Sequence, residues 1–175
     1  MLTEQVIQSN RESILALLRV TGRENIESVI AYLEKSGFFL VPSSLNRHHN
    51  WRGGLAQHCL GVYRAAKEKS DGLPGDSVII AGLLHDVCKA GKLYYDEDGQ
   101  LHHRKTHIHG HGYRSVKLLE RCGLRLTEDE RRAIRWHMGG HHAQESEKED
   151  VLAARQSLLW KVIHEADKWD AKYGV

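Results

Sequence analysis

The sharpest chemical feature of the sequence is the run His85-Asp86-Val87-Cys88-Lys89, which ends an apolar segment from Val78 to Leu84. A buried helix has little reason to end in an imidazole, a carboxylate and a cation unless these groups bind something. On a helix, Lys89 lies over the same face as His85 and Asp86, because it follows them by four and three residues. This spacing suits a phosphate held between a metal-bound carboxylate and the lysine. An ordinary ion pair between Asp86 and Lys89 is the alternative.

Two further residues of the metal-ligand type lie in apolar segments far from this run. His58 is four residues beyond Gly54, in a segment where a histidine is usually a hydrogen-bonded core residue. Asp167 lies late in an apolar segment, where an unpaired carboxylate is expensive to bury and a cation would relieve the cost. Lys161 and Lys168 are alternative partners for it. Taken singly, each residue therefore has a structural interpretation beside the metal-binding one.

Histidine is the unusual residue of the composition, since the chain has 13 of them. That density favours metal binding. The three cysteines include no Cys-x-x-Cys pair, so they indicate reduced packing residues rather than a disulfide framework or a zinc ribbon. The histidine groups are His48-His49, His102-His103, His107/His109/His111, His137 and His141-His142.

The composition predicts one all-α domain over residues 1–175. With 41% hydrophobic residues the chain can form a core, and only two prolines interrupt a sequence rich in helix formers. A formal charge of +2 gives no case for electrostatic capture of nucleic acid or a membrane, so an anionic substrate must be held locally. No apolar run approaches the roughly 20 residues of a membrane span, and the first ten residues lack the layout of a secretory signal. We therefore expect a cytoplasmic protein without membrane contact.

The helices that must position these residues follow from apolar periodicity and stop signals. An N-terminal helical pair occupies residues 1–37, and a metal-binding core occupies residues 47–170. Thr127 and Glu130 form a capping box. Alternation around Asp98-Gly99 predicts a hairpin or loop excursion near residues 92–103, long enough to be a lid. The predicted helices span residues 3–20, 24–35, 54–69, 76–89, 109–121, 127–138 and 151–172.

The order of these elements resembles the H…HD…D signature of the HD-domain metal-dependent phosphohydrolases, from about Arg47 to Asp170. The resemblance is closest to stand-alone HD hydrolases and to the HD domain of bacterial 3′-to-5′ exoribonucleases, which also have a His-rich loop before Gly-Gly-Leu. The matching motifs are Gly53-Gly54-Leu55-Ala56-Gln57-His58, Ala81-Gly82-Leu83-Leu84-His85-Asp86-Val87-Cys88-Lys89 and Glu165-Ala166-Asp167.

The resemblance implies an HD-domain helical bundle around one or two divalent ions. Mixed imidazole and carboxylate ligands suit Mn, Fe, Ni, Co or Zn better than Ca, and an open coordination position would yield hydroxide near neutral pH. Asp86 and Lys89 would then be the catalytic residues, with Lys89 stabilising charge on the phosphoryl oxygens. The implied metal ligands are His58, His85, Asp86 and Asp167.

A second ion is left open by the sequence. His111 and His137 match the positions of second-site ligands in binuclear members of the family. Those members have two adjacent histidines at the later position, whereas this chain has Met138 there. His141 or His142 could substitute across Gly139-Gly140, so one ion and two ions both remain possible.

Other polar residues are candidates for substrate contact or support. The candidate substrate contacts are Arg52, His49 and His141, of which the first two lie in the loop leading to the His58 helix. His164 and Asp170 lie three residues on either side of Asp167, which makes them supporting partners of that carboxylate or simple helix-end polar groups.

The predicted function is hydrolysis of a phosphomonoester or phosphodiester of a nucleotide or of a nucleic-acid end, including the 3′ end of RNA or DNA. Without space for an oligonucleotide-binding domain, a small phosphorylated molecule is as plausible a partner as RNA. Two alternatives remain, a non-catalytic domain that senses a metal or nucleotide, and a di-iron oxygenase of the HD type. The lysine beside the carboxylate favours phosphate. The sequence does not indicate an oligomeric state.

Overall fold

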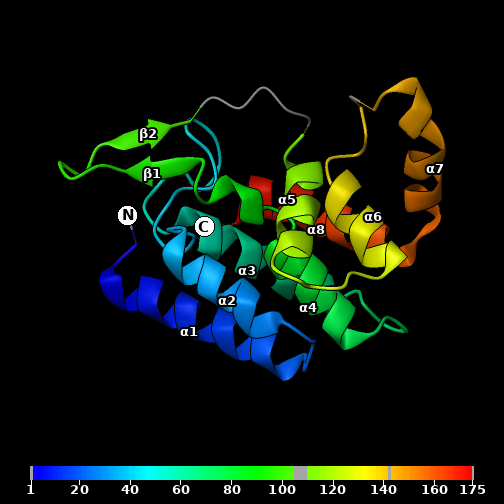
Figure 1. Ribbon diagram of the computed structural model, residues 1–175, viewed down its shortest axis with the longest axis horizontal. Helices are drawn as coiled ribbons and strands as arrows, with labels where there is room; N and C mark the ends of the chain where they lie inside the picture. Colours follow the sequence, from blue (N-terminus) through cyan, green and yellow to red (C-terminus); the bar gives the residue numbers. More distant parts are fainter. Residues whose placement is uncertain (1, 105–109, 142, 175) are drawn as a thin grey trace.

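The computed structural model describes residues 2–104, 110–141 and 143–174. Over these residues the chain forms eight α-helices, two short 3-10 turns and one two-stranded sheet (Figure 1). The all-α prediction is thus confirmed. The elements are α1 (Glu4–Val20), α2 (Ile26–Lys35), α3 (Gly54–Lys67), α4 (Gly75–Leu84), η1 (Val87–Lys89), β1 (Leu93–Tyr95), β2 (Leu101–His103), α5 (His111–Arg121), α6 (Glu128–Trp136), η2 (Glu145–Glu147), α7 (Lys148–Gln156) and α8 (Leu158–Tyr173).

Helices α3 and α4 form the centre of the core, since they contact each other and both contact α1 and α8. Every residue of α4 from Ser77 to Leu84 is buried, as expected of a helix that is apolar on all sides. Helices α1 and α2 cover one side of this centre, and α5 and α6 cover the other, with α7 at the outer edge (Figure 1). The elements that carry His58, His85 and Asp167 are therefore the most deeply packed ones.

A glycine sets the close approach of α3 and α4. A Cβ atom at Gly82 would lie 2.9 Å from the Cα of Tyr63, so any side chain there would force the two helices apart. Tight contact between these helices places the end of α4 beside the middle of α3.

The fourth helix is shorter than predicted, because α4 ends at Leu84 rather than near Lys89. Asp86 has φ −111° and ψ 12°, outside helical geometry, and the chain then makes the 3-10 turn η1. The residues of the His85-Asp86 pair therefore sit at a helix end instead of along a regular helical face. The apolar periodicity continues through Val87, which is why the sequence concealed this end.

The predicted last helix, residues 151–172, is wrong as a single element. The chain breaks at Ser157, whose ψ of 131° is extended, so α7 and α8 are separate helices. No glycine or proline marks the break. Packing decides it, because α7 packs against α6 and α8, whereas α8 runs along α3 and also packs against α6.

The predicted excursion near residues 92–103 is a β-hairpin. Strands β1 and β2 pair antiparallel, with Leu93 opposite His103 and Tyr95 opposite Leu101, and Gly99 takes a positive φ of 76° in the turn. The hairpin projects from the helices at the left of Figure 1. His107 and His109 lie outside the described residues, as does His142. Among the described helices, none is long and apolar enough to cross a membrane.

A buried carboxylate links α4 and α6. Glu130 is 0% exposed, and it accepts hydrogen bonds from the Ser77 hydroxyl at 2.7 Å and from the Thr127 amide at 2.8 Å. It also forms an ion pair with Arg23, which bonds Asp76 at 2.8 Å. The predicted capping box is thus present, and it is part of a larger polar network.

Replacing Glu130 with alanine should lower the free energy of unfolding by about 3–5 kcal/mol, because it leaves buried donors and the Arg23 guanidinium without their main acceptor. Urea denaturation followed by circular dichroism measures the loss. Glu128→Ala is the matched control: its exposed ion pair with Arg131, at 3.3 Å, should cost less than about 1 kcal/mol. Equal losses in the two variants would contradict the role given to the network.

Candidate metal centre

Four predicted ligands converge from α3, the end of α4 and α8. The Nε2 atom of His58 lies 3.3 Å from His85 Nε2 and 3.2 Å from Asp167 Oδ1. Asp86 Oδ2 lies 3.5 Å from His85 Nε2 and 3.7 Å from His58 Nε2. All four side chains are buried or nearly so, with Asp167 the most exposed at 7%. Ligand atoms from residues 109 positions apart thus share one small volume.

The other oxygen of Asp86 faces a second group of histidines. Asp86 Oδ1 lies 3.6 Å from His111 Nε2 and 3.7 Å from His137 Nε2. Helices α5 and α6 meet closely here, because a Cβ atom at Gly112 would lie 2.3 Å from the Arg135 carbonyl oxygen. That contact brings the rings of His111 and His137 to a centroid distance of 5.1 Å. Asp86 therefore stands between two histidine groups.

The histidines are oriented by bonds on the side away from the cluster. His85 Nδ1 lies 2.9 Å from the Gly82 carbonyl, and His137 Nδ1 lies 2.7 Å from the Ile134 carbonyl. Because a carbonyl oxygen only accepts, each Nδ1 must carry the proton and donate. The Nε2 atoms of His85 and His137 therefore point into the cluster as lone pairs when these rings are neutral, which is the arrangement of metal-binding histidines.

The cluster contains polar atoms without a hydrogen-bond partner. Within the described residues, Asp86 Oδ1 and His137 Nε2 are both buried and unpaired. Burying such atoms is costly unless another group satisfies them. A cation between them would satisfy both, so the residues present fit a divalent metal ion. In each of three overlapping groups, one ligand atom per residue lies within 4.8 Å of the others, so each group could hold an ion. The groups are His49/His58/Asp170, His58/His85/Asp167 and His85/Asp86/His137.

The protonation states of the clustered side chains suit metal ligands. Burial would raise the pKa of Asp86, but the Lys89 charge together with His85 and His111 outweighs burial and holds this pKa well below its usual range. Burial lowers the pKa of His137 to about 3, so this ring is neutral at pH 7. Burial would also lower the pKa of His58, but hydrogen bonds with Asp167 and Asp170 outweigh it and raise the pKa to about 9. Binding an ion at His58 would displace that proton.

Lys89 stands at the edge of the cluster. Its Nζ lies 2.5 Å from Asp86 Oδ2 and 3.4 Å from the Ser43 hydroxyl, and the side chain is 19% exposed. Burial would lower the pKa of Lys89, but the charge of Asp86, the hydrogen bond to Asp86 and the charge of Asp167 together outweigh burial and raise this pKa, so the amine remains charged. A fixed ammonium group thus adjoins the ligand atoms.

Asp170 belongs to the site, although the sequence left it undecided between a supporting and a helix-end role. Its Oδ2 lies 2.7 Å from His58 Nδ1, in the same relation that the carbonyls hold to the other two rings. A Cβ atom at Gly61 would lie 1.9 Å from Asp170 Oδ1, so the carboxylate fills space that only glycine leaves open. The spacing of three residues from Asp167 was the available signal.

Of the three candidate substrate contacts, two have partners elsewhere. Arg52 pairs with Glu4 on α1. His49 is 1% exposed, and its Nε2 lies 3.6 Å from Asp170 Oδ2, so it packs behind His58. The third, His141, is exposed and lines a pocket of about 300 Å³ together with His111.

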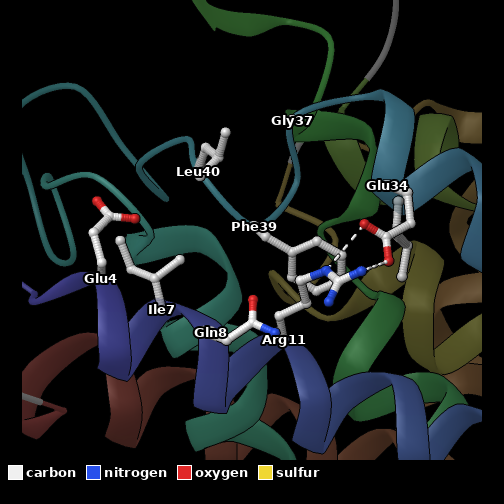
Figure 2. A pocket seen from close by; sticks show the side chains of 9 residues that line it. Glu4, Ile7, Gln8, Arg11, Glu34, Gly37, Phe39 and Leu40 are labelled. Atoms are coloured by element: carbon white, nitrogen blue, oxygen red, sulfur yellow. Dashed lines mark hydrogen bonds and ion pairs between the residues drawn. The ribbon is translucent and has the colours of Figure 1, made fainter.

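A separate groove of about 410 Å³ lies between α1, α2 and the turn that follows α2. In Figure 2, Arg11 reaches across it to Glu34, at 2.5 Å, and Glu4 lies at the other end. The residues that line this groove include none of the clustered histidines or aspartates. It holds no arrangement of metal-ligand type, and the chemistry of the molecule is concentrated at the histidine and aspartate cluster.

Comparison with known proteins agrees with this geometry. Residues 55–172 match the model of the HD domain family. The chain is also similar to a protein of Methanocaldococcus jannaschii named dihydroneopterin 2′,3′-cyclic phosphate phosphodiesterase. The identity is 34% over 71 residues, which cover 36% of this chain and 28% of that relative. No solved structure gives a significant match. Since the family match covers more than half of the sequence and includes all four convergent ligands, the chain belongs to the HD-domain superfamily of metal-dependent phosphohydrolases.

Proposed function

We propose that this protein hydrolyses a phosphate ester with the help of divalent metal bound at the cluster. The observation that carries the proposal is the set of inward-facing Nε2 atoms and carboxylate oxygens, with the unpaired Asp86 Oδ1 among them. The ligands of the first ion would be His58, His85, Asp86 and Asp167. Mn, Fe, Ni, Co and Zn all suit such a mixed set.

A divalent ion held by these residues would lower the pKa of a bound water and would supply a nucleophile near neutral pH. The protein contributes orientation and charge. Lys89 has a charged amine anchored against Asp86 and Ser43, in position to bind a phosphoryl oxygen and to stabilise the negative charge that grows there during attack. Asp170 holds the His58 ring through Nδ1, so the ring need not reorient when it binds the ion.

We also propose that the cluster holds a second metal ion. Asp86 directs one oxygen toward His58 and His85 and the other toward His111 and His137, so this carboxylate would contribute to both groups. The neutral His137 ring and the partly exposed His111 would provide two further nitrogens. We therefore favour two ions over one.

For the substrate we propose a phosphorylated small molecule of nucleotide type. The M. jannaschii relative is named for a cyclic phosphate on a heterocyclic compound, which supports this class. The 3′ end of RNA or DNA is the second candidate, and His141, in the pocket beside His111, is a candidate contact. We also propose a cytoplasmic location, because the unpaired buried thiols of Cys59 and Cys88 suit a reducing compartment.

Asp86→Ala should abolish both metal binding and hydrolysis, because this carboxylate contributes to both halves of the cluster. Metal content by mass spectrometry and turnover of a generic phosphate ester, after loading with each metal, measure the two effects. Asp129→Ala, an exposed carboxylate on α6, is the control and should retain both. Unchanged turnover in Asp86→Ala would remove the cluster from the mechanism.

Lys89→Gln should retain metal but lower kcat by about 10²–10³-fold, since it removes a preorganised charge from the transition state while leaving the ligands in place. The same experiment separates the alternatives. An oxygenase would consume oxygen with iron bound, and a sensory domain would bind metal in wild type without any product.

His137→Ala should reduce the bound metal from two ions per chain to one, because it removes a ligand on the Oδ1 side of Asp86 only. Calorimetric titration of the metal-free protein gives the stoichiometry. His102→Ala in the exposed hairpin is the matched control. A wild-type stoichiometry of one ion, unchanged in His137→Ala, would establish the mononuclear form instead.

A further inference from the structure

A pocket of about 330 Å³ adjoins Lys89 and, among the residues that the structure describes, has no lining residue from α5 or α6. Its volume lies within the roughly 300–1,000 Å³ typical of ligand sites. Three separate segments build it: the loop before α3, the turn η1 and the hairpin. We call it the cationic pocket and define it by its polar and charged lining residues, which are Ser43, Ser44, Asn46, Arg47, Lys89, Lys92 and His103.

The charges around this pocket are of one sign. Among the described residues that line it there is no carboxylate. Of its cations, Lys89 pairs with Asp86, whereas Arg47 and Lys92 form no ion pair with any carboxylate that the structure describes. A concavity with an excess of positive charge attracts an anion. The pocket therefore suits a negatively charged group.

The backbone around the cations is held in place. The Ser44 hydroxyl donates to the His48 carbonyl at 2.9 Å and accepts from the Arg47 amide at 2.9 Å, which closes the loop around Arg47. On the hairpin side, the Arg104 amide donates to the Lys92 carbonyl at 2.9 Å. Because these bonds already fix both segments, binding an anion there would require little reordering of the backbone.

Lys89 connects the pocket to the metal centre. Its Nζ lies 2.5 Å from Asp86 Oδ2 on one side and 3.4 Å from the Ser43 hydroxyl on the other. Ser43 is 2% exposed, and while its oxygen accepts from Lys89 its hydrogen can donate to an anion. A substrate whose reacting phosphate sits at the cluster can therefore place a neighbouring anionic group in the cationic pocket.

We propose that the cationic pocket binds a second phosphate group of the substrate, so that the enzyme prefers a nucleotide with two phosphates over the matching monophosphate. This inference rests on the proposed hydrolysis of the first phosphate at the cluster. The second phosphate can follow the first in a diphosphate or occupy another position of the ribose, and both forms present the same chemistry to Arg47, Lys92 and Ser43. The hairpin then has a binding role, since it carries Lys92 at its base and His103 in β2.

The test is the double variant Arg47→Gln/Lys92→Gln in the full chain. We measure kcat/KM for a nucleoside diphosphate, a nucleoside 3′,5′-bisphosphate and a nucleoside monophosphate. The ratio of either two-phosphate substrate to the monophosphate should fall by about tenfold to hundredfold, because charged hydrogen bonds to the second phosphate are lost. The two-phosphate substrate whose ratio falls shows whether the second phosphate belongs to a diphosphate or to another position of the ribose. Ratios unchanged for both would overturn the proposal.

The control is Lys35→Gln/Arg121→Gln, which removes the same charge at two exposed positions and should leave both ratios as in wild type. An equal fall in the control would mean that general charge, not the pocket, selects the substrate, and would also overturn the proposal. Arg47→Glu provides a second variant at an exposed position, and its ratio should fall further.

Binding of inorganic pyrophosphate to the metal-free protein separates this inference from the proposed function. Calorimetry should show binding at least about tenfold weaker in the double variant than in wild type and in the control. If wild type hydrolyses no phosphate ester but shows this difference in binding, the proposed function fails and the pocket stands. If hydrolysis occurs while both pyrophosphate binding and the kinetic ratios are unchanged, the pocket fails and the function stands.

Discussion

The structure depends on holding three carboxylates inside a helical core. Asp86, Asp167 and Asp170 are all nearly inaccessible, and isolated buried carboxylates would be strongly unfavourable. In the described residues, His58 pairs with Asp167 and Asp170, and Lys89 pairs with Asp86. Where such compensation is present, a core can hold the negative charge that a metal ion requires.

The central helices serve this constraint. The bare backbone of Gly82 lets α4 approach α3, and Gly61 leaves room for the Asp170 carboxylate beside α3. Without these two close approaches, α4 and α8 would stand further from α3 and the ligand atoms could not share one volume. Packing and chemistry are therefore set by the same few contacts. The hydrogen bonds at the Nδ1 atoms of His58, His85 and His137 also matter, because they fix which nitrogen of each ring faces the cluster.

Local features of the fold were predictable from the sequence, and long-range ones were much less so. The Thr127–Glu130 capping box and the hairpin turn at Gly99 depend on nearby residues, and both are present. The break at Ser157 carries no helix-stop residue, because it is imposed by the different neighbours of α7 and α8. The convergence of His58 with Asp167 could be expected only through resemblance to a family, since periodicity says nothing about which distant helices meet.

Some features of the site were left open by the sequence for the same physical reason. Asp170 has the spacing of a supporting residue, but so does His164 on the other side of Asp167, and only coordinates show which one contacts His58. The lining of the cationic pocket is scattered between residues 43 and 103, and of its cations Arg47 and Lys92 belong to no local motif. Arg52 lies in the same loop as Arg47, yet it pairs with Glu4.

The close contact of α5 with α6 at Gly112 divides the ligands between two supports. His58, His85 and Asp167 belong to the central helices, whereas His111 and His137 are held by a peripheral pair whose spacing depends on one missing methyl group. A small displacement of that pair would alter the outer half of the cluster and leave the inner half intact. In the two-ion form proposed above, the crossing of these two helices therefore sets the geometry of the outer site, and a Cβ atom at position 112 would push the two helices apart.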